Sequence, residues 1–219
     1  MTKNNLEFSA GEAKIFIAGP AGKIETLTAT PTETSKNIVA IVCHPHPLFG
    51  GTMHNKVAYT LARAFKDLGL RTVRFNFRGV GHSEGSYGEG SAETEDLQAI
   101  MRWVQQTRPQ DAIWLAGFSF GSYVATRAAA VSEVSQLVTV APPVESFDFT
   151  ELATPSCPWL VVQGEEDEIV APQAVYRWHA TVQPTPRLIR IPKAGHFFHG
   201  QLIELREVLT TALVDQVAL

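Results

Sequence analysis

The stretch Gly117-Phe118-Ser119-Phe120-Gly121 determines how this chain of 219 residues is interpreted. An apolar segment of strand length, residues 112–116, precedes it, and a helix-forming segment, residues 122–130, follows it. A strand, a Gly-x-Ser-x-Gly turn and a helix in this order are typical of a nucleophile elbow, which exposes the serine hydroxyl. Glycine suits both ends, because a Cβ at either position would collide with the neighbouring strand or helix. The pattern therefore predicts Ser119 as a nucleophile and the Phe120 N–H as a donor to an oxyanion.

Composition and charge restrict the class of protein. Hydrophobic residues make up 45% of the chain and charged residues 18%, as in ordinary globular proteins. The net charge of −4 comes with no basic run, so neither nucleic acid nor an anionic membrane surface is an expected partner. Residues 1–7 lack the apolar core of a signal peptide, and no segment approaches the ~20 apolar residues of a membrane span. We expect a soluble cytoplasmic protein.

The two cysteines, Cys43 and Cys157, each adjoin an apolar run that has the pattern of a buried strand. This favours small buried hydrophobic residues in a reducing compartment, and the sequence leaves a disulfide between them open.

Strand and helix patterns alternate along the chain after residue 37. Strand patterns cover residues 38–43, 70–77, 112–116, 137–141, 159–162 and 188–191, and helical periodicity marks residues 57–68, 97–104, 122–130, 172–181 and 202–213. The alternation predicts βαβ units and a mostly parallel, twisted sheet of about seven or eight strands with helices on both faces. An antiparallel hairpin is expected ahead of it, with strands at 15–18 and 24–29 joined by Gly19-Pro20-Ala21-Gly22. A loop is expected at residues 30–37. Without repeats or linkers, residues 1–219 are expected to form a single α/β domain.

A nucleophilic serine needs a base and an acid that orients the base. In a parallel sheet such groups follow the carboxyl ends of strands. His196 follows the last predicted strand and is the expected base, with His199 as the alternative. Asp167 follows the strand at 159–162 and is the expected acid, with Asp148 as the alternative. Other polar side chains are interpreted as surface groups, namely Glu165, Glu166, Glu168 and His179.

The loop at residues 44–55 is expected to supply the second oxyanion donor. Pro45 and Pro47 have no N–H, so the His46 N–H between them is the predicted donor, with that of Leu48 as the alternative. Zinc could in principle bind the histidines of this loop, namely His44, His46 and His54. Because no matching acid, cysteine or second histidine cluster accompanies them, we expect neither a metal nor another cofactor.

A glycine-rich segment, residues 78–85, follows another strand pattern. Its Gly79-Val80-Gly81 does not continue into a full dinucleotide-binding fingerprint, so a structural loop that passes close to the site is expected. The sequence leaves open whether Arg78 pairs with an acid such as Asp96.

The chain order Ser119, Asp167, His196 is that of the α/β-hydrolases, and the sequence resembles this superfamily over nearly its full length. Residues 44–55 and 76–85 are similar to the small bacterial hydrolases near the dienelactone hydrolases and the prolyl-oligopeptidase-like esterases. There are two departures. His-Pro-His-Pro stands where many relatives have His-Gly, and Ser119 stands where dienelactone hydrolases have cysteine. The resemblance implies the α/β-hydrolase fold and a serine hydrolase.

The connection between the strand patterns at 137–141 and 159–162 is too short for a cap domain. The site is therefore expected to be open, which favours small or exposed acyl groups over long lipid chains. The leading hypothesis is hydrolysis of short-chain carboxylic esters, small-molecule substrates, through an acyl-enzyme on Ser119. The alternatives are a thioesterase or peptidase with the same triad, and a catalytically silent binding or scaffold protein. The sequence predicts no oligomeric state.

Overall fold

The computed structural model describes residue 8 and residues 11–32 and 36–217. Its strands are β1 (Gly11–Gly19), β2 (Gly22–Thr30), β3 (Ile38–Cys43), β4 (Arg71–Phe75), β5 (Ala112–Phe118), β6 (Gln136–Val140), β7 (Trp159–Gly164) and β8 (Arg187–Ile191). Its α-helices are α1 (Lys56–Asp67), α2 (Ser91–Thr107), α3 (Phe120–Ala129), α4 (Pro172–Thr181) and α5 (Leu202–Leu213). Two short 3₁₀ helices, η1 (Pro47–Phe49) and η2 (Val214–Val217), were not expected from the sequence.

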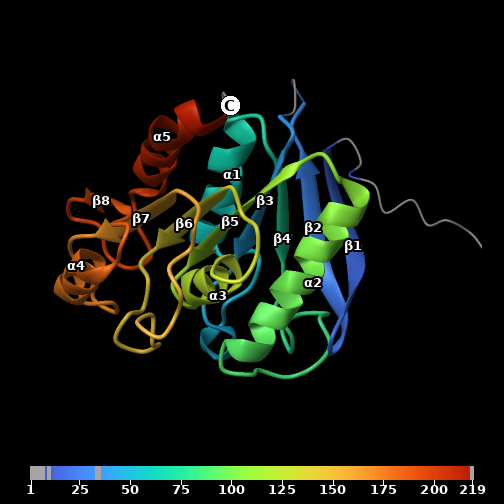
Figure 1. Ribbon diagram of the computed structural model, residues 1–219, viewed down its shortest axis with the longest axis horizontal. Helices are drawn as coiled ribbons and strands as arrows, with labels where there is room; N and C mark the ends of the chain where they lie inside the picture. The colour runs from blue at the N-terminus through green and yellow to red at the C-terminus, as the bar shows by residue number, and fades with distance from the viewer. Residues whose placement is uncertain (1–7, 9–10, 33–35, 218–219) are drawn as a thin grey trace, which may run out of the picture.

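All eight strands join one twisted sheet in the order β1-β2-β4-β3-β5-β6-β7-β8 (Figure 1). The β1–β2 hairpin is antiparallel, and β2 also runs antiparallel to β4, whereas the strands from β4 to β8 are all parallel. Between β6 and β7, residues 141–158 contain neither a helix nor a strand, so no cap domain is present there. The predicted fold class is confirmed, including the antiparallel hairpin.

The sheet has a hydrophobic core on each face (Figure 1). On one face α1 and α5 bury Leu61, Phe65, Leu205 and Leu209 against the sheet. On the other face α2, α3 and α4 bury Leu97, Val104, Val124, Val175 and Trp178. Because helices cover both faces, the residues of the central strand β3 are apolar throughout rather than alternately apolar and polar. The two cores fix the carboxyl ends of the parallel strands at one edge, where polar loops follow.

The strand predicted at residues 70–77 is shorter in the structure, because the backbone at both ends bonds elsewhere. The N–H of Leu70 donates to the carbonyl of Phe65 at the end of α1. The N–H of Phe77 donates to Nε2 of His44 at 3.0 Å. At the hairpin, Gly22 has a φ of +122°, a conformation that residues with a side chain rarely adopt, so glycine suits this position.

Three further expectations concern the N-terminal residues, membrane-spanning segments and the two cysteines. Residues 1–7, on which the signal-peptide expectation rests, lie outside the described residues, as do 33–35 within the loop predicted at 30–37. No helix in the described ranges has the length and apolar character that crossing a bilayer requires. Cys43 is buried and Cys157 only partly so, and both are free thiols.

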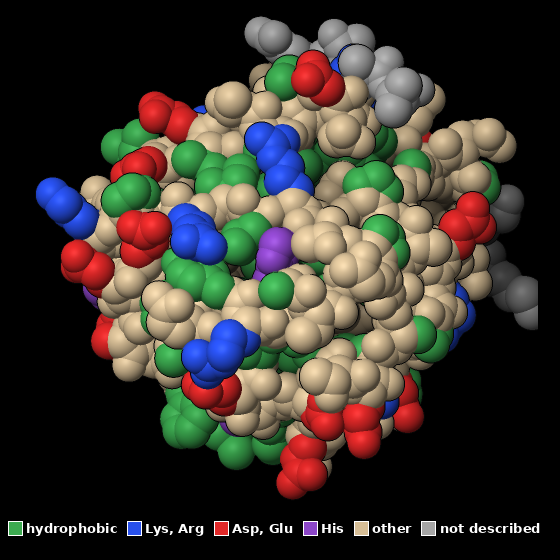
Figure 2. Space-filling model, turned by 60° about the vertical axis from the view of Figure 1, so that its left-hand side comes forward, with side chains coloured by type: hydrophobic (Ala, Val, Ile, Leu, Met, Phe, Trp, Pro, Cys, Tyr) green, Lys and Arg blue, Asp and Glu red, His purple; other side chains and the backbone are tan. Residues whose placement is uncertain are grey.

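In Figure 2, the face on the α4 and β8 side carries acidic and basic side chains that are interspersed rather than separated into regions of one charge.

A buried carboxylate ties the hairpin to the segment after β4. Glu25 of β2 is 3% exposed, pairs with Lys14, and accepts hydrogen bonds from the Asn76 amide at 2.7 Å and the His82 N–H at 2.8 Å. Burial by itself raises the pKa of Glu25, but these hydrogen bonds and the Lys14 charge outweigh it and lower the pKa from 4.5 to about 2. A depressed pKa means that Glu25 stabilises the fold above pH 4.5, and that this contribution is lost as the pH falls toward 2.

We therefore expect Glu25→Gln to lower the thermal midpoint at pH 7, with a deficit that shrinks as the pH falls from 4.5 to 2. Thermal denaturation followed by circular dichroism across this range measures it. Glu133→Gln, at an exposed carboxylate, is the control and should show no such trend. A Glu25→Gln deficit that stays constant with pH would contradict the assignment.

Candidate active site

Ser119 lies in the turn between β5 and α3 with an unusual backbone conformation. Its φ is 53° and its ψ is −122°, a region that residues with a side chain rarely adopt. Its N–H donates to the carbonyl of Val140 at the end of β6 at 2.9 Å, and its carbonyl accepts from the Ser122 hydroxyl at 2.6 Å. Such strain persists only where the surrounding structure holds it, and it is concentrated at functional sites. The turn is therefore the sharp strand-to-helix bend that the sequence predicts.

The two glycines of the turn have the tight surroundings that the sequence analysis requires. A Cβ on Gly117 would overlap the carbonyl group of Gly121. A Cβ on Gly121 would overlap the carbonyl oxygens of Cys43 and His44 at the end of β3. Neither obstacle is a flexible side chain, so both positions need glycine.

His196 and Asp167 meet as a buried pair after β8 and β7. Nδ1 of His196 lies 2.9 Å from Oδ2 and 3.1 Å from Oδ1 of Asp167. His196 is 3% exposed and Asp167 6%. A carboxylate only accepts hydrogen bonds, so Nδ1 carries a proton, and Nε2 is the nitrogen available to act as a base when the ring is neutral. The predicted base and acid are thus brought together, in the tautomer that a general base requires.

The Asp167 carboxylate is held by more than His196. Its Oδ1 accepts the N–H groups of Ile169 at 2.9 Å and Val170 at 2.7 Å, and its Oδ2 accepts the Gln163 amide at 3.0 Å. Burial by itself raises the pKa of Asp167, but the hydrogen bond and charge of His196 and the two backbone donors lower it below its usual value. The carboxylate is therefore ionised at neutral pH and fixed in orientation.

Glu168 has a role at this site that the sequence analysis did not assign. Its Oε2 accepts the backbone N–H of His196 at 3.0 Å, and a Cβ on Gly195 would come within 2.7 Å of the same oxygen. Glu168 thus anchors the main chain of His196 while Asp167 anchors its ring. Glu168 is exposed, as expected of a surface group. Its contact with His196 depends on the approach of two loops in three dimensions, so the sequence does not reveal it.

The alternative acid and base lie in other settings. Asp148 is exposed, and its Oδ1 accepts the N–H and hydroxyl of Thr150 and the N–H of Glu151, which makes a local turn. His199 is exposed, and its ring contacts that of Phe197 with 5.8 Å between centroids. His179, expected at the surface, is partly buried and bonds the carbonyl of Pro186 at 2.7 Å.

The oxyanion loop, residues 44–50, holds the two candidate second donors in different states. The Leu48 N–H donates to Nδ1 of His46 at 3.2 Å and so caps η1. The N–H groups of His46 and Phe120 have no acceptor within the part of the chain that the structure describes. The geometry thus favours His46 over Leu48 as the partner of Phe120.

The histidines near this loop do not form a metal site in the described ranges. The two ring nitrogens of His44 are engaged, Nδ1 with the Pro45 carbonyl at 2.6 Å and Nε2 with the Phe77 N–H at 3.0 Å. Burial lowers the pKa of His44 to about 4, so the ring is neutral and serves to join two strand ends.

Comparison with known proteins agrees with this geometry. A family model described as the alpha/beta hydrolase fold matches residues 41–156, more than half of the chain. The chain is a member of the α/β-hydrolase family. An uncharacterized protein of Rickettsia prowazekii is 37% identical over 92% of this chain and 88% of its own length.

Two solved structures resemble this α/β-hydrolase closely. One is an α/β serine hydrolase without a lid from Xanthomonas campestris, 46% identical, with a TM-score of 0.91 over 94% of this chain and 95% of the other. The second is an α/β serine hydrolase homologue from Coxiella burnetii, 47% identical, with a TM-score of 0.92 over 94% of this chain and 100% of the other. The family and these relatives support hydrolase activity.

Asp167→Asn should lower kcat by roughly 10⁴, because an amide at this position favours the tautomer in which Nε2 carries the proton. Steady-state hydrolysis of a chromogenic short-chain ester at pH 7 measures the change. Asp148→Asn, the matched control, should leave kcat within about twofold. The reverse pattern would assign the acid to Asp148.

Glu168→Ala should lower kcat/KM about tenfold, because the His196 main chain loses its anchor and the base is misplaced. Glu168→Gln keeps a side-chain oxygen that can accept the same N–H and should stay within about threefold of the wild type. Equal activity of the Ala variant and the wild type would show that the contact does not position His196.

Proposed function

We propose that this α/β-hydrolase is a serine hydrolase that cleaves short-chain carboxylic esters through an acyl-enzyme on Ser119. The observation that carries the proposal is the buried His196–Asp167 pair, which leaves Nε2 of His196 as a base, together with the strained serine turn. Ser119 follows β5, Asp167 follows β7 and His196 follows β8. These parallel strands belong to one sheet, and the active groups of such sheets gather at the carboxyl ends of the strands.

The reaction follows from the protonation states of these groups. Ser119 Oγ attacks the acyl carbonyl while its proton passes to Nε2 of His196. The N–H groups of Phe120 and His46 donate to the oxyanion of the tetrahedral intermediate. As the intermediate collapses, the imidazolium returns the proton to the departing alkoxide, and the alcohol leaves. Water then attacks the acyl-enzyme by the same route and releases the carboxylic acid and free Ser119.

The choice of short and exposed acyl groups rests on the surroundings of the site. The β6–β7 connection, residues 141–158, provides no cap to enclose a long chain. The relative from Xanthomonas campestris is likewise described as lacking a lid. A small ester can reach the proposed nucleophile without being enclosed on all sides.

Two kinds of alternative to the ester hydrolase remain: an enzyme with the same catalytic residues and another substrate, and a protein without catalysis. A thioesterase or a peptidase would share the triad Ser119, Asp167 and His196 and differ in the leaving group. A binding or scaffold protein would keep the fold without turnover. Matched ester, thioester and anilide substrates with one common acyl group separate the first two from the proposal, because their kcat/KM values share every acyl contact. A faster thioester or anilide would replace the ester assignment.

Ser119→Ala should fold normally and hydrolyse esters at background rate, because no other group supplies the attacking oxygen. A fluorophosphonate probe should label the wild type once per chain and leave the variant unlabelled, as intact mass spectrometry would show. Ser132→Ala, in the turn after α3, is the control and should retain labelling and turnover. Absence of labelling on folded wild-type protein would favour the scaffold alternative.

A further inference from the structure

We propose that Tyr87 is a positioning residue that sets the oxyanion loop, residues 44–50, through a hydrogen bond to the ring of His46. The inference rests on the proposed function, since it concerns the placement of the second oxyanion donor. Tyr87 lies in the segment between β4 and α2, far from the elbow in sequence, and nothing in its sequence context marks it as part of the site.

The hydrogen bonds of the His46 ring define its tautomer. Nδ1 accepts the N–H of Leu48 at 3.2 Å, so this nitrogen carries no proton and Nε2 does. Nε2 lies 3.1 Å from the Tyr87 hydroxyl and therefore donates to it. Burial lowers the pKa of His46, and the charge of Glu93 only partly opposes this, so the ring is neutral and both hydrogen bonds are available at neutral pH.

The same ring also packs against other aromatic side chains near the serine turn. Its centroid is 4.9 Å from that of Phe120, whose backbone provides the first donor, and 4.9 Å from that of Tyr87. The Phe49 ring packs against it at 4.7 Å. The His46 backbone N–H belongs to the residue whose side chain is held in this way. A shift of the ring would therefore be transmitted to the His46 backbone, which carries the second proposed donor.

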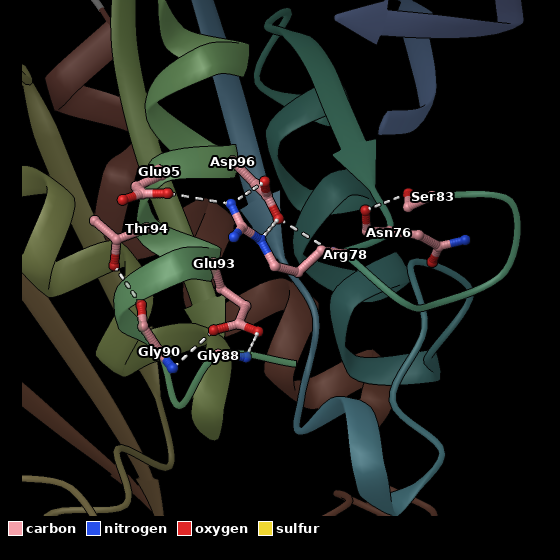
Figure 3. Close-up of polar contacts among 9 residues, drawn as sticks. All are labelled: Asn76, Arg78, Ser83, Gly88, Gly90, Glu93, Thr94, Glu95 and Asp96. Atoms are coloured by element: carbon pink, nitrogen blue, oxygen red, sulfur yellow. Dashed lines mark hydrogen bonds and ion pairs between the residues drawn. The ribbon is translucent and has the colours of Figure 1, made fainter. Parts of the chain in front are cut away.

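The backbone that follows Tyr87 is held by hydrogen bonds to the start of α2. Glu93, fully buried, accepts the N–H groups of Gly88 at 2.8 Å and Gly90 at 2.7 Å, and the Thr94 hydroxyl donates to the Gly90 carbonyl at 2.7 Å (Figure 3). A carboxylate accepting two backbone donors is a strong, oriented contact. The residues that follow Tyr87 are thus fixed to a helix of the core.

The other end of the segment is fixed to the same helix. Arg78 forms a two-pronged ion pair with Asp96, with Nε at 2.9 Å from Oδ2 and an Nη at 2.7 Å from Oδ1 (Figure 3). The Arg78 N–H also donates to Asp96 at 3.1 Å, and Asp96 is 1% exposed. Arg78 therefore pairs with Asp96, a pairing that the sequence alone does not determine. Fixed at both ends to α2, the segment 78–90 presents the Tyr87 hydroxyl to His46 as a rigid support.

Tyr87→Phe tests this inference, because it keeps the ring and removes only the hydroxyl. A donor that moves without being lost should lower kcat about 10- to 100-fold with KM within about twofold and the thermal midpoint unchanged. A trifluoromethyl ketone, which Ser119 would convert to a tetrahedral oxyanion, should bind weaker by a similar factor. Tyr123→Phe is the matched control. The Tyr123 hydroxyl bonds only Arg127 among the described residues, so kcat and ketone affinity should match the wild type.

A readout that needs no turnover is the ring-nitrogen spectrum of His46 in ¹⁵N-histidine-labelled protein. The Nε2 signal should shift in Tyr87→Phe and not in Tyr123→Phe. Unchanged kcat and ketone affinity in Tyr87→Phe, or equal losses in both variants, would overturn the inference. A wild type that neither hydrolyses esters nor reacts with the phosphonate would contradict the proposed function instead. In that case the nitrogen signals decide the inference alone, and an Nε2 signal that Tyr87→Phe leaves unchanged overturns it.

Discussion

The close approach of the start of α3 to the end of β3 is the constraint on which the rest of the site depends. Only the missing Cβ of Gly121 lets the helix begin against the carbonyls of Cys43 and His44. That contact brings the serine turn beside the oxyanion loop, since the loop begins where β3 ends. His44, which follows β3, is in turn joined to the end of β4, because its Nε2 accepts the Phe77 N–H. Three strand ends are thus joined by backbone contacts and one neutral imidazole.

The proposed base, His196, is held by two carboxylates with separate tasks. Asp167 fixes the ring of His196 and Glu168 fixes its main chain. Burying an ionised carboxylate is costly unless its oxygens are hydrogen-bonded, and Asp167 has donors on both oxygens. The Gln163 amide that donates to one of them leaves its own buried Oε1 without a hydrogen-bond partner among the described residues. The free-energy cost of this unpaired oxygen accompanies the hydrogen bond that orients Asp167, the proposed acid.

The sequence was informative where a feature depends on neighbours along the chain. Helix α4 has the predicted limits, because Pro172 suits a first helical turn and the apolar spacing is regular. The serine turn and the order of the triad candidates likewise follow from local patterns. The end of β4 and the role of Glu168 did not, since both depend on groups from distant segments. The contact of Tyr87 with His46 could not be predicted either, because the two residues lie 41 positions apart.

The backbone of Ser119 has a consequence for how the protein can change over evolutionary time. A non-glycine residue in this conformation costs of order 1–3 kcal/mol, and glycine would adopt it without that strain. Part of this gain would be offset by the greater freedom of glycine in the unfolded chain. Mutation toward greater thermodynamic stability at this position therefore leads away from the hydroxyl. As the proposed nucleophile, Ser119 would be kept there only by selection for chemistry, so the identity of this one residue would record whether a descendant retains the proposed activity.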